Sequence, residues 1–139
     1  MTGVATPPGG RGPVMAHFIL YVADQAAATT FWTTVLDRQP RLNVPGMTEF
    51  ALIEGAVLGL MPEAGIKALL GTTLPDPALA RGVPRSELYL VVADPAAYHG
   101  RALAAGAREL APLAQRDWGD TVAYCLDLDG HVVAFAGHA

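Results

Sequence analysis

The sequence has few of the features of a secreted, membrane-spanning or nucleic-acid-binding protein. Cys125 is its only cysteine, which excludes an internal disulfide and a cysteine metal cluster and is typical of a reducing compartment. No apolar run approaches the roughly 18 residues of a membrane-spanning helix, and the opening residues lack the apolar core of a signal peptide. We therefore expect a cytoplasmic protein that is not bound to a membrane.

Charge is also scarce. Charged residues make up 16% of the chain, the net charge is −4, and the arginines are scattered rather than clustered. A nucleic-acid partner would favour a basic face, so we expect none. Hydrophobic residues make up 52% of the 139 residues, which is enough to build the core of one globular domain.

A direct repeat organises the chain. The stretches HFILYVADQAA (17–27) and ELYLVVADPAA (87–97) are identical at six of eleven positions. In each stretch a strand-like run is followed by an aspartate that is suited to cap the next helix. The helices are predicted over 25–36 and 95–106. Three strand-like runs follow each helix, at about 38–44, 48–53 and 56–61 in the first copy and about 108–113, 121–126 and 131–136 in the second. The sequence therefore predicts an α+β chain of two tandem βαβββ modules.

The predicted boundaries give four segments. They are a flexible Gly/Pro-rich tail over 1–14, the first module over 15–61, a linker over 62–86 and the second module over 87–139. The linker has two interpretations. It connects the modules, or it also forms a flap over a binding cleft with apolar contacts from Leu69, Leu70 and Leu74.

The stretch RDWGDTVAYCLDLDGHVVAFAG (116–137) predicts two strands around a tight turn, with Gly130 at a positive φ. Alternation puts only small apolar side chains on one face of the last strand, namely Val132, Ala134 and Ala136. With the duplicated order and the run FWTTVLDRQP after residue 30, this stretch resembles the vicinal oxygen chelate superfamily. That group contains glyoxalases, bleomycin resistance proteins and extradiol dioxygenases.

The resemblance covers roughly residues 15 to 137 and implies an incomplete, cup-shaped barrel of eight strands with the helices outside and the ligand on the concave side. It also implies that metal-dependent members take one ligand from the first and one from the last strand of each module. The corresponding positions in this chain are His17, Gly59, Glu87 and Ala134. Only His17 and Glu87 carry donor groups, and two donors hold a divalent ion weakly. We expect no bound metal or other cofactor, and a divalent metal stays open as the alternative.

Alternation also predicts which side chains line the cup, and the Trp118-Gly119 pair resembles one that precedes the penultimate strand of bleomycin resistance proteins. The predicted ligand-binding residues are His17, Ile19, Tyr21, Val57, Gly59, Met61, Glu87, Tyr89, Trp118, Val132 and Ala134. They form a mostly apolar lining with a few polar groups, as small-molecule sites do. We expect a protein that binds a small, partly aromatic molecule without a metal, in the manner of drug or metabolite sequestration and antibiotic resistance.

The alternative is a metal-dependent lyase of the lactoylglutathione-lyase type or an extradiol-type dioxygenase whose ligands are misassigned. The nearby acids that such a site would recruit are Glu54, Glu63, Asp127 and Asp129, although the two aspartates fit better as turn formers. A metal-free acid–base pair of His17 and Glu87 is a further option, and no catalytic residue is assigned.

The remaining residues of interest have structural interpretations. Cys125 is predicted to be a buried structural thiol, and His99, His131 and His138 to be solvated surface histidines. One βαβββ module leaves a strand edge that is normally paired with another module, so we expect a homodimer.

Overall fold

The repeat in the sequence is also a repeat of secondary structure. The computed structural model describes residues 12–138, so residues 1–11 of the predicted tail lie outside the described part. The first module consists of β1 (Ala16–Val22), α1 (Gln25–Leu36), β2 (Leu42–Val44), β3 (Met47–Ile53) and β4 (Ala56–Pro62). The second consists of β5 (Glu87–Val91), α3 (Pro95–Ala104), β6 (Arg108–Gln115), β7 (Thr121–Leu126) and β8 (Val132–Gly137). The predicted order and the α+β class are confirmed.

The two module helices begin where the sequence places their caps. The Asp24 carboxylate accepts the Ala27 N–H at 3.0 Å, and the Asp94 carboxylate accepts the Ala97 N–H at 3.1 Å. Each bond satisfies an amide of the first turn that has no partner inside the helix. Helix α1 has the predicted bounds, whereas α3 ends at Ala104, before the predicted end at residue 106.

Strand β2 is shorter than the run predicted over about 38–44 and covers only Leu42–Val44. Asp37 ends α1 in the left-handed conformation, with φ 53°, and Pro40 follows with no backbone N–H to donate. These two residues turn the chain away from the sheet before it can pair. The Glu54-Gly55 turn and the positive φ of Gly130 (86°) agree with the prediction.

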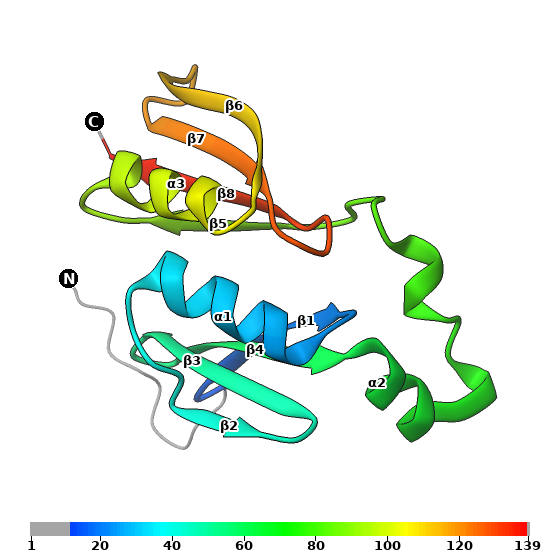
Figure 1. Ribbon diagram of the computed structural model, residues 1–139. Helices are drawn as coiled ribbons and strands as arrows, with labels where there is room; N and C mark the ends of the chain where they lie inside the picture. The colour runs from blue at the N-terminus through cyan, green and yellow to red at the C-terminus, as the bar shows by residue number, and fades with distance from the viewer. Residues whose placement is uncertain (1–11, 139) are drawn as a thin grey trace.

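The strands form two separate four-stranded sheets, in the orders β1-β4-β3-β2 and β5-β8-β7-β6. In each sheet the first strand pairs in parallel with the last strand of its module, and the remaining pairs are antiparallel. Figure 1 shows β1 and β5 in the middle of the molecule, with β2 and β6 at its outer ends. The sheets are not closed into a barrel, which is consistent with the predicted cup.

One face of each sheet is buried against its helix, and the two helices also contact each other. Residues of both modules form a single core cluster that contains Trp32, Phe50, Leu58 and Phe135. Across the helix contact, the Arg101 guanidinium donates to the Val35 carbonyl at 3.2 Å. Trp32 is 1% exposed and therefore belongs to the core, as predicted.

Cys125 lies in the same core and is fully buried. Burial raises the pKa of its thiol to about 11, so the thiolate does not form in the folded protein at physiological pH. The prediction of a structural thiol is confirmed.

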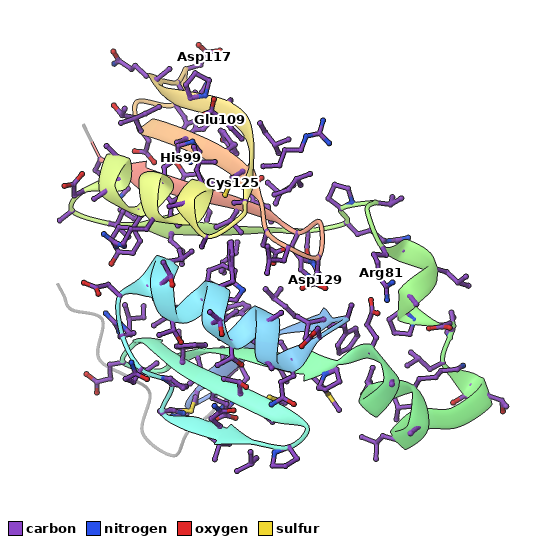
Figure 2. All side chains as sticks on the ribbon, in the orientation of Figure 1. Arg81, His99, Glu109, Asp117, Cys125 and Asp129 are labelled. Carbon is purple, nitrogen blue, oxygen red and sulfur yellow. The ribbon has the colours of Figure 1, made fainter. Side chains whose placement is uncertain are left out.

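The prediction of a solvated His99 is wrong. His99 is only 7% exposed, and its Nε2 lies 2.9 Å from Glu109 Oε2 (Figure 2). Its ring packs against Phe135. It lies on the side of α3 that faces the sheet, so the core covers it. His131 also contacts another part of the fold, because its Nε2 lies 3.1 Å from the Tyr21 carbonyl oxygen in the first module.

The linker is folded. It contains α2 (Glu63–Leu70) and two short 3-10 turns, η1 (Gly71–Thr73) and η2 (Pro77–Ala80). Leu69 and Leu70 are 71% and 49% exposed, and Leu74 lines a cavity. Of the helices in residues 12–138, none combines the length and the apolar character needed to cross a bilayer.

Candidate functional site

The predicted ligand-facing strand residues lie on the sheet faces that the helices leave uncovered, called here the open faces. On β1, Leu20 and Val22 belong to the helix-side core, so His17, Ile19 and Tyr21 alternate to the open face. Their partners on β4 share that face because they are paired directly with them, namely Val57, Gly59 and Met61. On the second sheet the same register pairs Glu87 with Val132 and Tyr89 with Ala134.

An ion-pair cluster occupies the open face of the first sheet. Glu49 on β3 faces Gly59 directly across the strand pair, and its side chain is only 14% exposed. Its Oε2 lies 3.5 Å from His17 Nδ1, and its Oε1 accepts the Nε–H of Arg41 at 2.9 Å. Arg41 Nη2 lies 2.9 Å from the same oxygen and completes an ion pair. A carboxylate therefore lies beside His17, on the strand next to the one where the family pattern would place it. No motif in the sequence had pointed to Glu49 or Arg41.

Neighbouring side chains fill the space above Gly59. A Cβ atom at Gly59 would lie 3.0 Å from Ile19 Cγ1 and 3.3 Å from Met47 Sδ. The glycine therefore permits close packing on the open face, and any larger residue would have to displace Ile19.

The open face of the second sheet is aromatic. Ala134 is paired with Tyr89 on one side and with Tyr124 on the other. Together with Val122 and Ala136 it forms a small apolar cluster against which both tyrosines pack. The Arg116 guanidinium lies 5.4 Å from the Tyr124 ring centroid. Applying the two-residue period to TVAYCL (121–126) would have placed Tyr124 on this face.

Trp118 is held at the edge of this face by a chain of hydrogen bonds. Its indole N–H donates to the Tyr89 hydroxyl at 2.9 Å, and that hydroxyl donates to Asp120 Oδ2 at 2.6 Å. The other carboxylate oxygen, Oδ1, lies 2.8 Å from His138 Nδ1. Trp118 remains 58% exposed, so its ring is both fixed and accessible. Trp118 and Tyr89 were predicted site residues, whereas Asp120 was not, and His138 was predicted only as a solvated histidine.

The same bonds set the charge state of the site. Hydrogen bonds from Tyr89 and then His138 hold the pKa of Asp120 below its usual value, which keeps the carboxylate charged. Desolvation and the bond to Asp120 raise the pKa of Tyr89, so this residue stays a neutral phenol. The site offers a fixed anion, a neutral phenol and an indole, and neither titrating group is poised near neutral pH for proton transfer.

The structure does not bring all the predicted site residues together. Two cavities lie between the modules, and neither is lined by His17, Gly59, Trp118 or Ala134. Ile19 and Tyr21 line one of them and Glu87 and Tyr89 the other. Within residues 12–138, no hydrogen bond or ion pair joins His17 to Glu87.

The four positions that the family pattern would use for a metal do not fit a divalent ion in the single chain. Gly59 has no side chain, Ala134 is a buried methyl between two tyrosines, and no group of three His, Cys, Asp or Glu side chains in the described residues is arranged to hold a metal. Three protein donors are the usual minimum of a catalytic site.

The acids named as alternatives are engaged elsewhere. Asp127 accepts the backbone N–H groups of Asp129 and His131, as predicted for a turn former. Asp129 instead accepts the Ala23 N–H of the first module at 2.8 Å, so its predicted local role is wrong. Glu63 forms an ion pair with Arg81, and Glu54 lies in the hairpin turn before β4.

Comparison with known proteins gives one family and many similar folds. The model of the Glyoxalase/Bleomycin resistance protein/Dioxygenase superfamily matches residues 14–135. A glyoxalase-related enzyme from Fulvimarina pelagi is 23% identical over 89% of this chain and 87% of its own, with a TM-score of 0.75. A glyoxalase/bleomycin resistance protein/dioxygenase family enzyme from Burkholderia phytofirmans is 15% identical over 88% of this chain and 97% of its own, with a TM-score of 0.74. No curated protein matches the sequence.

The packing around Gly59 gives a test by substitution. We expect Gly59→Ala to lower the free energy of unfolding by about 1–3 kcal/mol, because the added methyl overpacks against Ile19. Gly100→Ala is the matched control, since it adds the same methyl in α3 where nothing lies within 4 Å, and we expect it to stabilise by about 0.5–1 kcal/mol.

Urea unfolding measures both changes. In an Ile19→Ala background the cost of Gly59→Ala should shrink, because the clashing Cγ1 atom is gone and only the contact with Met47 Sδ remains tight. Equal effects of Gly59→Ala and Gly100→Ala would contradict this account of the glycine.

Proposed function

Because the chain belongs to the Glyoxalase/Bleomycin resistance protein/Dioxygenase superfamily, we propose that it binds a small, partly aromatic molecule beside Trp118 without a bound metal ion. The observation that carries this proposal is the exposed indole whose N–H is tied to Tyr89 at 2.9 Å. A flat ring stacked on an indole gains ~0.5–1.5 kcal/mol beyond the area it buries. A ring that is already oriented avoids part of the ordering cost of binding.

The surroundings of Trp118 favour a particular ligand chemistry. The half-buried rings of Tyr89 and Tyr124 cover the buried Val122, Ala134 and Ala136 and form an apolar floor, while Glu87 at the start of β5 and Asp120 just before β7 supply carboxylates. A flat aromatic compound that carries a positive charge or hydrogen-bond donors suits this arrangement. The neutral phenol and the inaccessible Cys125 thiol offer no activated nucleophile, which supports binding and sequestration rather than turnover.

Ligand binding is tested with 9-aminoacridine, a flat aromatic cation, as the probe. We expect it to quench the emission of the wild-type protein, and we expect Trp118→Phe to lose the quenching while the buried Trp32 keeps its signal. Tyr89→Phe should weaken binding several-fold, because the indole N–H loses its acceptor. An unchanged affinity in Trp118→Phe, measured by equilibrium dialysis, would refute the proposed site.

A second function, a metal-dependent lyase or dioxygenase, is favoured by one observation. Glu49 places a carboxylate 3.5 Å from His17 on the open face, which restores a histidine–carboxylate pair. Arg41 opposes this interpretation, because its guanidinium already donates a hydrogen bond to Glu49 and forms an ion pair that neutralises the carboxylate. The metal-free proposal therefore has the stronger support.

Metal analysis separates the two functions. We expect protein purified without chelators to contain no stoichiometric Ni, Zn, Mn or Fe, and its melting temperature to stay constant when each ion is added. A rise with one ion that disappears in both His17→Ala and Glu49→Gln would instead establish the metal-dependent alternative, and lyase and ring-cleavage assays would follow.

We also propose that the protein is a homodimer. In the described part of the chain, β1 and β5 each hydrogen-bond to one neighbouring strand only, so each has a free edge. Apolar residues on these strands are exposed, including Phe18 at 51% and Val91 at 49%. Free edges with exposed apolar side chains are normally covered by another strand or another subunit.

Light scattering coupled to gel filtration measures the assembly. We expect the mass of two 14.5-kDa chains for the wild type and of one chain for Val91→Lys, which adds a charge to the free edge of β5. Leu79→Lys is the control, since Leu79 is 83% exposed on the linker. A monomeric wild type would contradict the proposal.

A further inference from the structure

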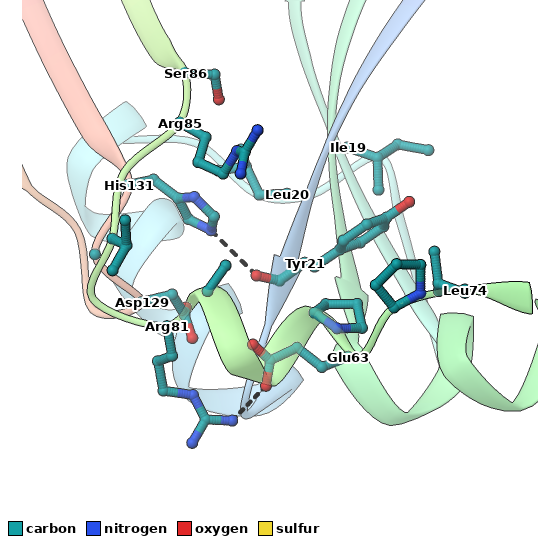
Figure 3. A pocket seen from close by; sticks show the side chains of 15 residues that line it. Ile19, Leu20, Tyr21, Glu63, Leu74, Arg81, Arg85, Ser86, Asp129 and His131 are labelled. Atoms are coloured by element: carbon teal, nitrogen blue, oxygen red, sulfur yellow. Dashed lines mark hydrogen bonds and ion pairs between the residues drawn. The ribbon is translucent and has the colours of Figure 1, made fainter. Parts of the chain in front are cut away.

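One of the two cavities between the modules lies away from Trp118, where the linker passes the end of β1. It has a volume of ≈ 440 Å³ and lies between β1, the linker and the β7–β8 turn (Figure 3). This volume is in the range of small-molecule sites. Its apolar wall is formed by Ile19, Leu74, Pro75, Pro77 and Val83. We call this cavity the linker cleft.

The walls of the linker cleft are tied to one another by polar contacts. Arg81 of the linker forms an ion pair with Glu63 of α2. Asp129 of the β7–β8 turn accepts the Ala23 N–H at 2.8 Å, and His131 Nε2 lies 3.1 Å from the Tyr21 carbonyl (Figure 3). These contacts hold the linker on one side of the cleft and both modules on the other.

The charges of the cleft are unevenly balanced. The charge of Arg81 is compensated by Glu63, and this ion pair raises the pKa of the Arg81 guanidinium. The nearby carboxylates of Asp129 and Asp76 raise that pKa further. Figure 2 shows Arg81 and Asp129 on the side where the linker passes the turn. Arg85 differs, because no acidic group in residues 12–138 lies within the 4.0 Å of an ion pair with it.

Two hydroxyl groups accompany this arginine. The side chains of Ser86 and Tyr21 line the same cleft, and neither makes a hydrogen bond to another described residue. Figure 3 shows Arg85 and Ser86 on the chain opposite β1, which carries Tyr21 and Ile19. The uncompensated guanidinium of Arg85 and the Ser86 hydroxyl thus lie across the cleft from Ile19 and Tyr21 of β1.

The geometry points to a binding site for an organic monocarboxylate with a ring-sized apolar body in the linker cleft, held by Arg85 and Ser86 at its charged end. A guanidinium binds a carboxylate through two parallel N–H donors. A phosphate dianion suits the cleft less well, because the carboxylates of Glu63 and Asp129 line it too. The inference goes beyond the proposed function, since it concerns the linker cleft instead of the surface beside Trp118, and an anionic ligand.

The test uses 3-phenylpropionate and its neutral amide, 3-phenylpropanamide, titrated into the full-length protein labelled with nitrogen-15. We expect the acid to shift the backbone amide resonances of Tyr21, Leu74, Ser86 and Gly130, which line the cleft, and to leave the Trp118 indole N–H unshifted. The amide should bind roughly tenfold more weakly, because it forms no charge-assisted hydrogen bond.

Two variants isolate the arginine. Arg85→Gln should weaken binding of the acid roughly tenfold without changing the melting temperature, because Arg85 is exposed and makes no ion pair in the described structure. Arg108→Gln removes an equal charge from exposed β6, outside the cleft, and should bind as the wild type does.

Any of three results would overturn the inference: equal affinity for acid and amide, unchanged binding in Arg85→Gln, or no shifts at millimolar acid. Shifts confined to Trp118 would also overturn it, while supporting the separate site of the proposed function.

Discussion

Burial of one face of each four-stranded sheet against its helix is the constraint on which the rest of the structure depends. The helix-side residues of both modules meet in a single core with Trp32, Phe31 and Phe135, because α1 and α3 contact each other. Side chains alternate along a strand, so every second residue is committed to this core. The side chains that can contact a ligand therefore lie on the open faces and on the segments that join the modules.

The two open faces have diverged although their backbones repeat. His17 corresponds to Glu87, Ile19 to Tyr89 and Gly59 to Ala134 in strand register. In both sheets a small residue lies between two larger ones. The first sheet uses this arrangement to hold a charged cluster around Glu49, and the second to hold two tyrosines beside Trp118. The same backbone arrangement thus carries a charged cluster on one open face and aromatic side chains on the other.

The positions where metal-dependent relatives would carry carboxylates are part of the packing. Ile19 and Met47 cover Gly59, and Ala134 is fully buried between Tyr89 and Tyr124. A carboxylate at either position would need both space and a partner, since an unpaired buried charge is strongly unfavourable. Gly59 and Ala134 therefore differ from the family pattern together with the residues that pack around them.

The sequence alone determined the module order, the helix caps, the buried Cys125 and the alternation that separates core from open face, because each depends on near neighbours in the chain. Only the tertiary structure decided that Glu49 lies beside His17, that Asp120 joins Tyr89 to His138, and that His99 is buried against Glu109. These contacts depend on strand register and on where turns end, and no local pattern encodes them. The linker cleft is the extreme case, because its walls come from segments that only folding brings together.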